Sequence, residues 1–305
     1  MLRRPSKFMQ GSDVAAESKG NADNISILLG TGVLPEQFPK LTNEVDDAPR
    51  LNRAITYAIS NNIDKIKLKG EVYTISSQTV DVPTGISIEG VGFDNKSSGV
   101  TGTRINRTAD IVAFKSLGVT VTSGTPNRSI RFKGIRFSGG DFVSDFMQLI
   151  AVGVSYFNDV MFTATQGRQL LLHEVMDSRF NDCVFEWGGN TSGTLPAIEL
   201  KSGSGYEYTN QVHFNGCRWE TYRGTALATT GTNSNEIFMQ NCKFESLISN
   251  TTHVKFSDAT AIHLDAVNIC SKGTAGSTIA EQIEFNNCNA VNGVLYLEHT
   301  GTIDL

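Results

Sequence analysis

Apolar residues alternate with polar residues in a short phrase that recurs along the later two-thirds of this 305-residue chain. Each copy contains two alternating runs, separated by a polar pair rich in Asn, Asp and Gly. Alternation is the periodicity of a β-strand, and these polar residues tolerate the left-handed backbone of a tight turn. Copies begin at Ile130, Phe157, Phe180, Phe214, Met239, Leu264 and Phe285, and an earlier copy begins at Ile86.

From Ile130 onward the copies follow one another at intervals of 21 to 34 residues. A repeat of this length, with strands and no helix, predicts one coil of a right-handed parallel β-helix, an all-β solenoid. Equivalent residues of successive coils then stack at about 4.8 Å. The expected inward columns are Phe180, Phe214, Met239, Leu264 and Phe285, and Phe162, Phe185, Trp219 and Phe244. The expected structural ladder at the turn is Asn158, Asn181, Asn215, Gln240, Asp265 and Asn286.

The chain before residue 63 does not share this repeat. Residues 1–42 are mostly polar at first and contain Pro35 and Pro39 near the end, which predicts an extended N-terminal arm. Residues 43–62 predict one helix, because apolar residues between Ala48 and Ile59 fall at helical spacing after two aspartates. A helix with one apolar face would cap the open end of a solenoid that occupies residues 63–305.

Composition limits the classes of partner. The net charge is −5, which argues against a nucleic-acid partner, and no apolar run is long enough for membrane insertion. The five cysteines have no CxxC spacing, and we expect no metal and no cofactor. Cys183, Cys217, Cys242 and Cys288 fall in one inward column, where reduced thiols indicate assembly in a reducing cytoplasm.

Three segments, at 47–58, 70–75 and 85–92, resemble the opening of pectate-lyase-like β-helix proteins. Over residues 46–295 the chain most resembles bacteriophage tailspike or appendage proteins. The resemblance implies a homotrimer that binds, and often cleaves, a bacterial surface polysaccharide or teichoic acid. It also implies a virion protein made in the host cytoplasm, whose arm attaches to tail or neck proteins. The sequence stops within an apparent strand at Leu305, so we expect the native protein to continue.

One outward column is unusual, because Glu186, Glu220 and Glu245 fall on three successive coils. Stacked like charges repel, so the column is either splayed into solvent or is a catalytic site for glycan cleavage. Hydrolysis needs two carboxyl groups, about 5–5.5 Å apart for retention or about 6.5–9.5 Å for inversion. Neighbouring coils suit the first separation and alternate coils the second.

Side chains near this column would bind the substrate. The longest interval between copies surrounds Trp187, Tyr206 and Tyr208, and insertions in repeat proteins form loops on the binding face. These rings, with Tyr222, would stack on sugars, or else pack at a loop base and cover a subunit interface. Arg218 belongs to a cationic column suited to an anionic polymer, although such charges often only solubilise a sheet.

Two other functions remain open at this level. The first is a non-catalytic receptor-binding or structural virion protein. The second is a polysaccharide lyase, which needs an Arg or Lys base and commonly calcium.

Overall fold

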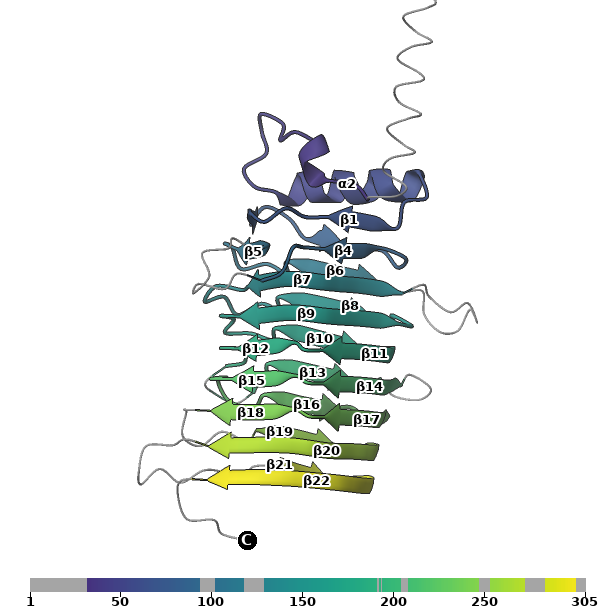
Figure 1. Ribbon diagram of the computed structural model, residues 1–305, viewed down its shortest axis with the longest axis vertical. Coiled ribbons are helices and arrows are strands. Elements are labelled where there is room, and N and C mark those ends of the chain that lie inside the picture. The colour runs from purple at the N-terminus through teal and green to yellow at the C-terminus, as the bar shows by residue number, and fades with distance from the viewer. Residues whose placement is uncertain are drawn as a thin grey trace, which may run out of the picture.

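The computed structural model describes residues 32–93, 102–117, 129–190, 192, 194–203, 208–246, 253–271 and 283–299. A short 3-10 helix, η1 (Pro35–Gln37), and one α-helix, α2 (Ala48–Ser60), precede a tall stack of strands (Figure 1). Every strand pairs with its neighbours in parallel. The predicted parallel β-helix is therefore confirmed.

Each coil has three faces, and the first two share one fourteen-stranded sheet. The first face contains β1 (Lys65–Lys67), β4 (Ser87–Glu89), β7 (Ile130–Ser138), β9 (Ser155–Thr163), β11 (Met176–Asn181), β14 (Thr209–Asn215), β17 (Ser234–Gln240), β20 (Ala259–Ser271) and β22 (Asn289–His299). The second face contains β2 (Val72–Ile75), β5 (Arg104–Arg107), β12 (Val184–Glu186), β15 (Arg218–Glu220) and β18 (Lys243–Ser246), with the later halves of β7, β9, β20 and β22.

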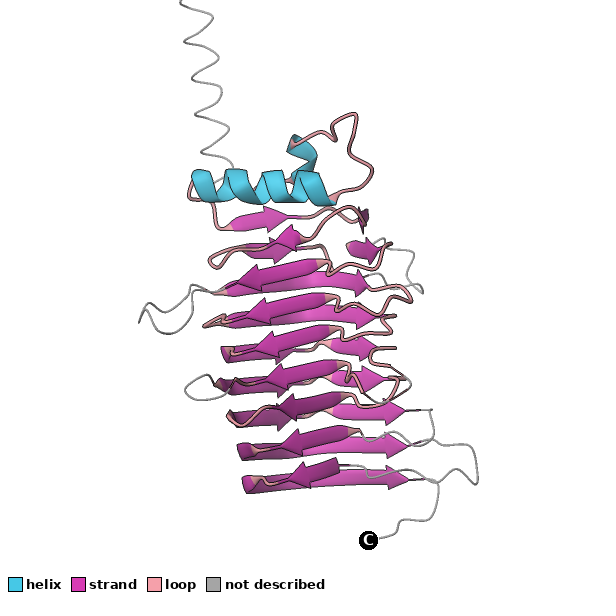
Figure 2. Cartoon of the chain, turned by 180° about the vertical axis from the view of Figure 1, so that it is seen from behind, coloured by secondary structure: helices cyan, strands magenta, loops and turns pink. Residues whose placement is uncertain are grey.

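The third face is a separate eight-stranded sheet. It contains β3 (Val80–Asp81), β6 (Phe114–Leu117), β8 (Met147–Ile150), β10 (Leu170–His173), β13 (Ile198–Lys201), β16 (Leu227–Thr230), β19 (Val254–Ser257) and β21 (Ile283–Asn286). Loops join the second face to the third along one edge of the stack, at the right of Figure 2.

The polar pair of each phrase lies at the corner between the first two faces. The second residue of the pair adopts a left-handed backbone, with φ of 53° at Asp159, 52° at Asp182, 63° at Gly216 and 52° at Asn241. Asp, Asn and Gly are the residues that tolerate this conformation most readily. The sequence therefore bends the strand at this corner in coil after coil.

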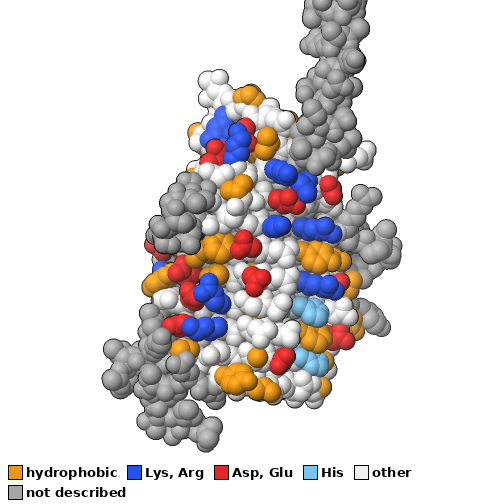
Figure 3. Space-filling view, in the orientation of Figure 1, with side chains coloured by type: hydrophobic (Ala, Val, Ile, Leu, Met, Phe, Trp, Pro, Cys, Tyr) orange, Lys and Arg blue, Asp and Glu red, His pale blue; other side chains and the backbone are white. Residues whose placement is uncertain are grey.

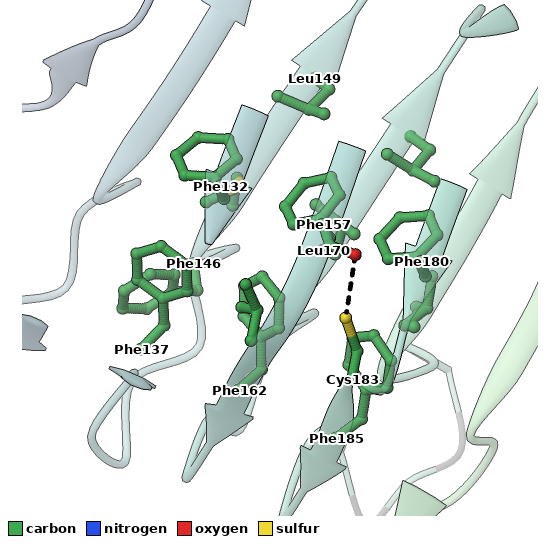
Figure 4. Packing of buried hydrophobic residues seen from close by; sticks show 14 of the residues in the cluster. Phe132, Phe137, Phe146, Leu149, Phe157, Phe162, Leu170, Phe180, Cys183 and Phe185 are labelled. Atoms are coloured by element: carbon green, nitrogen blue, oxygen red, sulfur yellow. Dashed lines mark hydrogen bonds between the residues drawn. The ribbon is translucent and has the colours of Figure 1, made fainter. Parts of the chain in front are cut away.

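Aromatic columns fill the interior, as predicted (Figure 4). Phe180 stacks on Phe157 and on Phe214, with ring centroids 4.6 and 4.8 Å apart, and Phe185 stacks on Trp219 at 5.1 Å. Beside them, three buried cysteines that lie in one column each donate a thiol to the carbonyl of an aromatic residue one coil earlier. The pairs are Cys183 with Phe157 at 3.5 Å, Cys217 with Phe180 at 3.4 Å and Cys242 with Phe214 at 3.4 Å.

The predicted columns are wrong for the last copy of the phrase, which begins at Phe285. Phe285 and Asn286 pair with Phe256 and Ser257 on the third face, and Gly293 is the residue that lies beneath Leu264. Cys288 follows the same corner and is only partly buried, so it lies outside the file of the other cysteines. Asp258 and Asn287 adopt the same left-handed backbone (φ 50° and 51°), but they lie at the corner between the third and the first face. The same turn residues at two corners explain why the last copy was assigned to the wrong one.

For the earliest copy, which begins at Ile86, only the first half follows the predicted columns. Ile88 lies above Phe132 as predicted, but the chain then leaves the stack. Val91 is exposed, and Ile105 in β5 lies above Phe137, the position that the alignment of the two copies gives to Phe93.

Helix α2 lies across the N-terminal end of the stack (Figure 1), within the range predicted for a capping helix. It buries Ala48, Leu51, Ala54, Ile55 and Ala58. Its two leading carboxylates bind the first coil: Asp46 accepts backbone N–H groups of Ser76 and Ser77, and Asp47 accepts that of Thr74. Within the described ranges, no helix has the length and apolar character needed to span a bilayer. Of the predicted arm, residues 1–31 lie outside the described part of the chain.

Candidate functional site

Three glutamates form one column at the end of the second face. Glu186 pairs with Glu220, and Glu220 pairs with Glu245, in direct register on β12, β15 and β18. The column ends at Thr163 above and at the buried Cys270 below. All three carboxylates are half-buried, so they are accessible from outside the stack.

Neighbouring side chains offset the charge of this column. The guanidinium of Arg218 lies 3.2 Å from the Glu220 carboxylate, and the Lys243 ammonium lies 2.5 Å from that of Glu245. The hydrogen bond to Glu245 is the largest of the effects that raise the pKa of Lys243. Figure 3 shows acidic and basic side chains side by side over these strands, at the left of the view.

Glu186 has a different partner. Its carboxylate accepts a hydrogen bond of 3.2 Å from the hydroxyl of Thr163. No Lys, Arg or His in the described part of the chain forms an ion pair with Glu186. The column therefore combines two carboxylates that are paired with cations and one that is bound by a hydroxyl group.

An exposed indole lies next to this column. Trp187 directly follows Glu186, adopts a left-handed backbone (φ 56°) and is 40% exposed. The guanidinium of Arg223 lies 5.9 Å from the centroid of its ring and 3.3 Å from the carboxylate of Asp141. Loops of three different coils thus meet beside Glu186. Arg223 and Asp141 were not predicted, because the repeat does not specify where a loop between coils runs.

The other predicted contacts do not gather here. Tyr222 is fully buried and packs edge-on against His253, so its ring cannot stack on a sugar, and we remove it from the site. Tyr208 is exposed, but it precedes β14 at the corner between the third and first faces, across the third face from the glutamates. Tyr206 lies outside the described residues.

Comparison with known proteins gives structural similarity only. No protein-family model matches the sequence, and no curated protein matches it. The ORF18 protein of Geobacillus virus E2 is 14% identical, with a TM-score of 0.67 over 95% of this chain and 66% of its own. The tailspike of Acinetobacter phage vB_ApiP_P1 is 14% identical, with a TM-score of 0.59 over 88% of this chain and 59% of its own.

A bacterial enzyme has the same architecture. WceF of Pantoea stewartii, described as a glycan biofilm modifying enzyme with a tailspike-like parallel β-helix, is 11% identical. Its TM-score is 0.55, over 88% of this chain and 38% of its own. The chain thus spans less than two thirds of the length of these proteins. Its fold is the parallel β-helix of phage tailspike proteins.

Proposed function

We propose that this chain is a subunit of a phage tail or neck appendage that binds and hydrolyses a surface polysaccharide or teichoic acid of the host bacterium. The observation that supports it best is the column of Glu186, Glu220 and Glu245 with the exposed Trp187 at its edge. The shared fold with a phage tailspike and with a glycan-modifying enzyme agrees with this function.

The chemistry follows from the partners of two carboxylates. Glu186 and Glu220 belong to adjacent strands, whose spacing of about 4.8 Å suits the separation of carboxyl groups in retaining glycosidases. Glu220, held by Arg218, attacks the anomeric carbon. Glu186, which forms no ion pair with a cation of the described residues, donates the proton to the leaving oxygen as the glycosidic bond breaks. Water then releases the sugar from Glu220, with Glu186 accepting the proton of that water.

Trp187 is the proposed binding platform for the sugar beside the cleaved bond. One side of the indole contacts Arg223, and its exposed part is adjacent to Glu186. Replacing Trp187 with Ala should weaken binding more than it slows cleavage at saturating polymer, because the ring does not take part in proton transfer.

The test compares Glu186→Gln and Glu220→Gln with Glu89→Gln, a control at another ion-paired glutamate in a strand. We expect the wild-type chain and the control to shorten host envelope polymer, measured by light scattering, and to create reducing ends. Both site variants should be at least about 100-fold slower with unchanged melting curves. Full activity in both would rule out this pair, and ultraviolet-absorbing unsaturated ends would indicate a lyase.

A non-catalytic receptor-binding protein is the second candidate. The ion pairs of Arg218 and Lys243 favour it, because they give Glu220 and Glu245 a structural role. Polymer that binds at full length and stays at full length would select this candidate.

We also propose that the chain forms a homotrimer and that residues 1–42 attach it to the virion. Light scattering should give three times the 33.1 kDa mass of one chain. A chain lacking residues 1–31 should keep its thermal stability and fail to incorporate into particles. A monomer in solution, or normal incorporation of the shortened chain, would contradict the corresponding part of this proposal.

A further inference from the structure

A second outward column runs along the first face, away from the glutamates. It contributes one residue from each of six successive coils, in direct register. We call it the aromatic–cation ladder: Arg131, Tyr156, Arg179, His213, Phe238 and His263. Figure 3 shows basic, hydrophobic and histidine side chains in a vertical file over this face, at the right of the view.

The side chains of the ladder hold one another in place. The guanidiniums of Arg131 and Arg179 lie 5.2 and 5.9 Å from the centroid of Tyr156. Phe238 lies between His213 and His263, with centroids 4.4 and 4.5 Å apart and ring planes within 6° of parallel. A surface that is ordered before it binds loses less conformational entropy on binding.

The stacking direction determines what the ladder offers to a ligand. The rings stack on one another from coil to coil, so their faces are covered and their edges point outward. The edge of an aromatic ring has a positive partial charge, and the guanidiniums are cationic. The ladder therefore favours an anionic group over the apolar face of a neutral sugar.

A polar column runs parallel to the ladder, two residues further along each strand. Its members are Lys133, Asn158, Asn181, Asn215, Gln240 and Asp265, and the amides of Asn158 and Asn181 are joined by a hydrogen bond of 2.8 Å. A pocket of about 240 Å³ lies where the two columns meet, lined by His213, Phe238 and His263 together with Asn215, Gln240 and Asp265. Amide groups both donate and accept hydrogen bonds, which suits sugar hydroxyls.

Acidic groups on this face limit the positive charge but do not remove it. Asp177 pairs with Arg179 at 3.0 Å, and Glu236 and Asp265 lie beside the lower coils. Arg131 is exposed and forms no ion pair with a carboxylate of the described residues. The strongest anion attraction is therefore expected at the upper end, around Arg131 and Tyr156.

We propose that the aromatic–cation ladder binds an acidic polysaccharide along the first face. The carboxylates or phosphodiesters of the polymer contact the cations of the ladder, and its hydroxyl groups form hydrogen bonds with the polar column. The repeat of the surface in one direction fits a repeating ligand. This site is separate from the glutamate column, and its binding does not depend on cleavage.

The test measures binding of the full chain by affinity electrophoresis in gels that contain one polymer each. Polygalacturonate supplies carboxylates, polyglycerol phosphate supplies phosphodiesters, and dextran is neutral. The ladder variant is Arg131→Gln with Arg179→Gln. The matched control is Lys201→Gln with Lys255→Gln, which also removes two outward cations, one of them ion-paired, from the third face.

We expect one or both acidic polymers, and not dextran, to retard the wild-type chain. The ladder variant should lose about tenfold or more in affinity and the control less than about twofold. Retardation by polygalacturonate or by polyglycerol phosphate alone assigns the carboxylate or the phosphodiester as the bound group.

The proposal is wrong if neither acidic polymer binds, or if the ladder variant and the control bind equally well. It is also wrong if the ladder variant changes the oligomeric state, because the column would then be a subunit interface. A chain that binds through the ladder but shortens no polymer supports this proposal while contradicting the proposed hydrolase.

Discussion

His253 packs edge-on against Tyr222, with ring centroids 5.5 Å apart and planes at 77°, and both side chains are fully buried. Burial disfavours the charged imidazolium and lowers the pKa of His253 to about 4. The folded protein therefore holds His253 neutral at a pH where an unfolded chain binds a proton.

This relationship predicts acid sensitivity. Because the folded pKa lies below the unfolded value near 6.5, the stability contributed by neutral His253 is complete above pH 6.5 and falls toward pH 4. Between pH 7 and pH 5 the loss should be about 2 kcal/mol. Urea unfolding at both pH values measures it. His253→Phe should remove most of this loss, whereas equal losses in the variant and the wild type would contradict the assignment.

Arg107 should be among the residues most sensitive to substitution. It is buried, and its guanidinium donates to the backbone carbonyls of Ile111, Gly139, Phe142, Ser144 and Asp145. Burial lowers the pKa of Arg107 to about 10. Arg107→Leu leaves these carbonyls without their donor and should cost about 3–5 kcal/mol.

Denaturant unfolding measures this cost, with Lys201→Leu as the control at an exposed cation. The control should change stability by less than about 0.5 kcal/mol. Similar small changes in both variants would show that Arg107 does not hold the loop between the second and third faces.

Native thiols should differ sharply in reactivity. Cys183, Cys217, Cys242 and Cys270 are buried, and Cys288 is partly exposed. Burial is the largest of the effects that raise the pKa of Cys217. Brief alkylation of the folded protein should label Cys288 alone, and labelling in denaturant should reach all five. Mass spectrometry of digested peptides distinguishes these outcomes. Rapid native labelling of Cys217 would show that the stack opens.

Binding to the ladder should strengthen as the pH falls. Burial, followed by the nearby Arg179, lowers the pKa of His213, while Asp177 and Glu236 act in the opposite direction. Protonation adds a cation to the ladder below the ordinary histidine range, so affinity for an acidic polymer should rise from pH 7.5 to pH 5. His213→Gln should reduce this rise. The same pH profile in both proteins would exclude His213 as its source.

From Ile130 to Ile269, the sequence was sufficient for the columns whose phrase lies at the corner of the first two faces. Phe180, Cys217 and Glu220 fall where their spacing predicts, because each coil repeats the same turn. The copy at Phe285 failed because its Asn-Asn turn also suits the corner after the third face. Local turn chemistry identifies a corner but does not say which corner it is.

The site was predicted less completely, for a related reason. Strand alternation gives the outward direction of Glu186, but it does not apply beyond the turn, where Tyr222 points inward. The contact of Arg223 with Trp187 depends on the paths of loops from different coils. The ladder does not emerge from the sequence as one surface, because Tyr156 and Phe238 link its cations and histidines only after the coils are placed in register.

The bonds from Asp46 and Asp47 to residues 74–77 have a consequence for synthesis on the ribosome. They join partners about thirty positions apart, so helix α2 and the first coil can form while most of the polypeptide is still untranslated. Each later coil can then pair with a completed edge as soon as its own residues emerge.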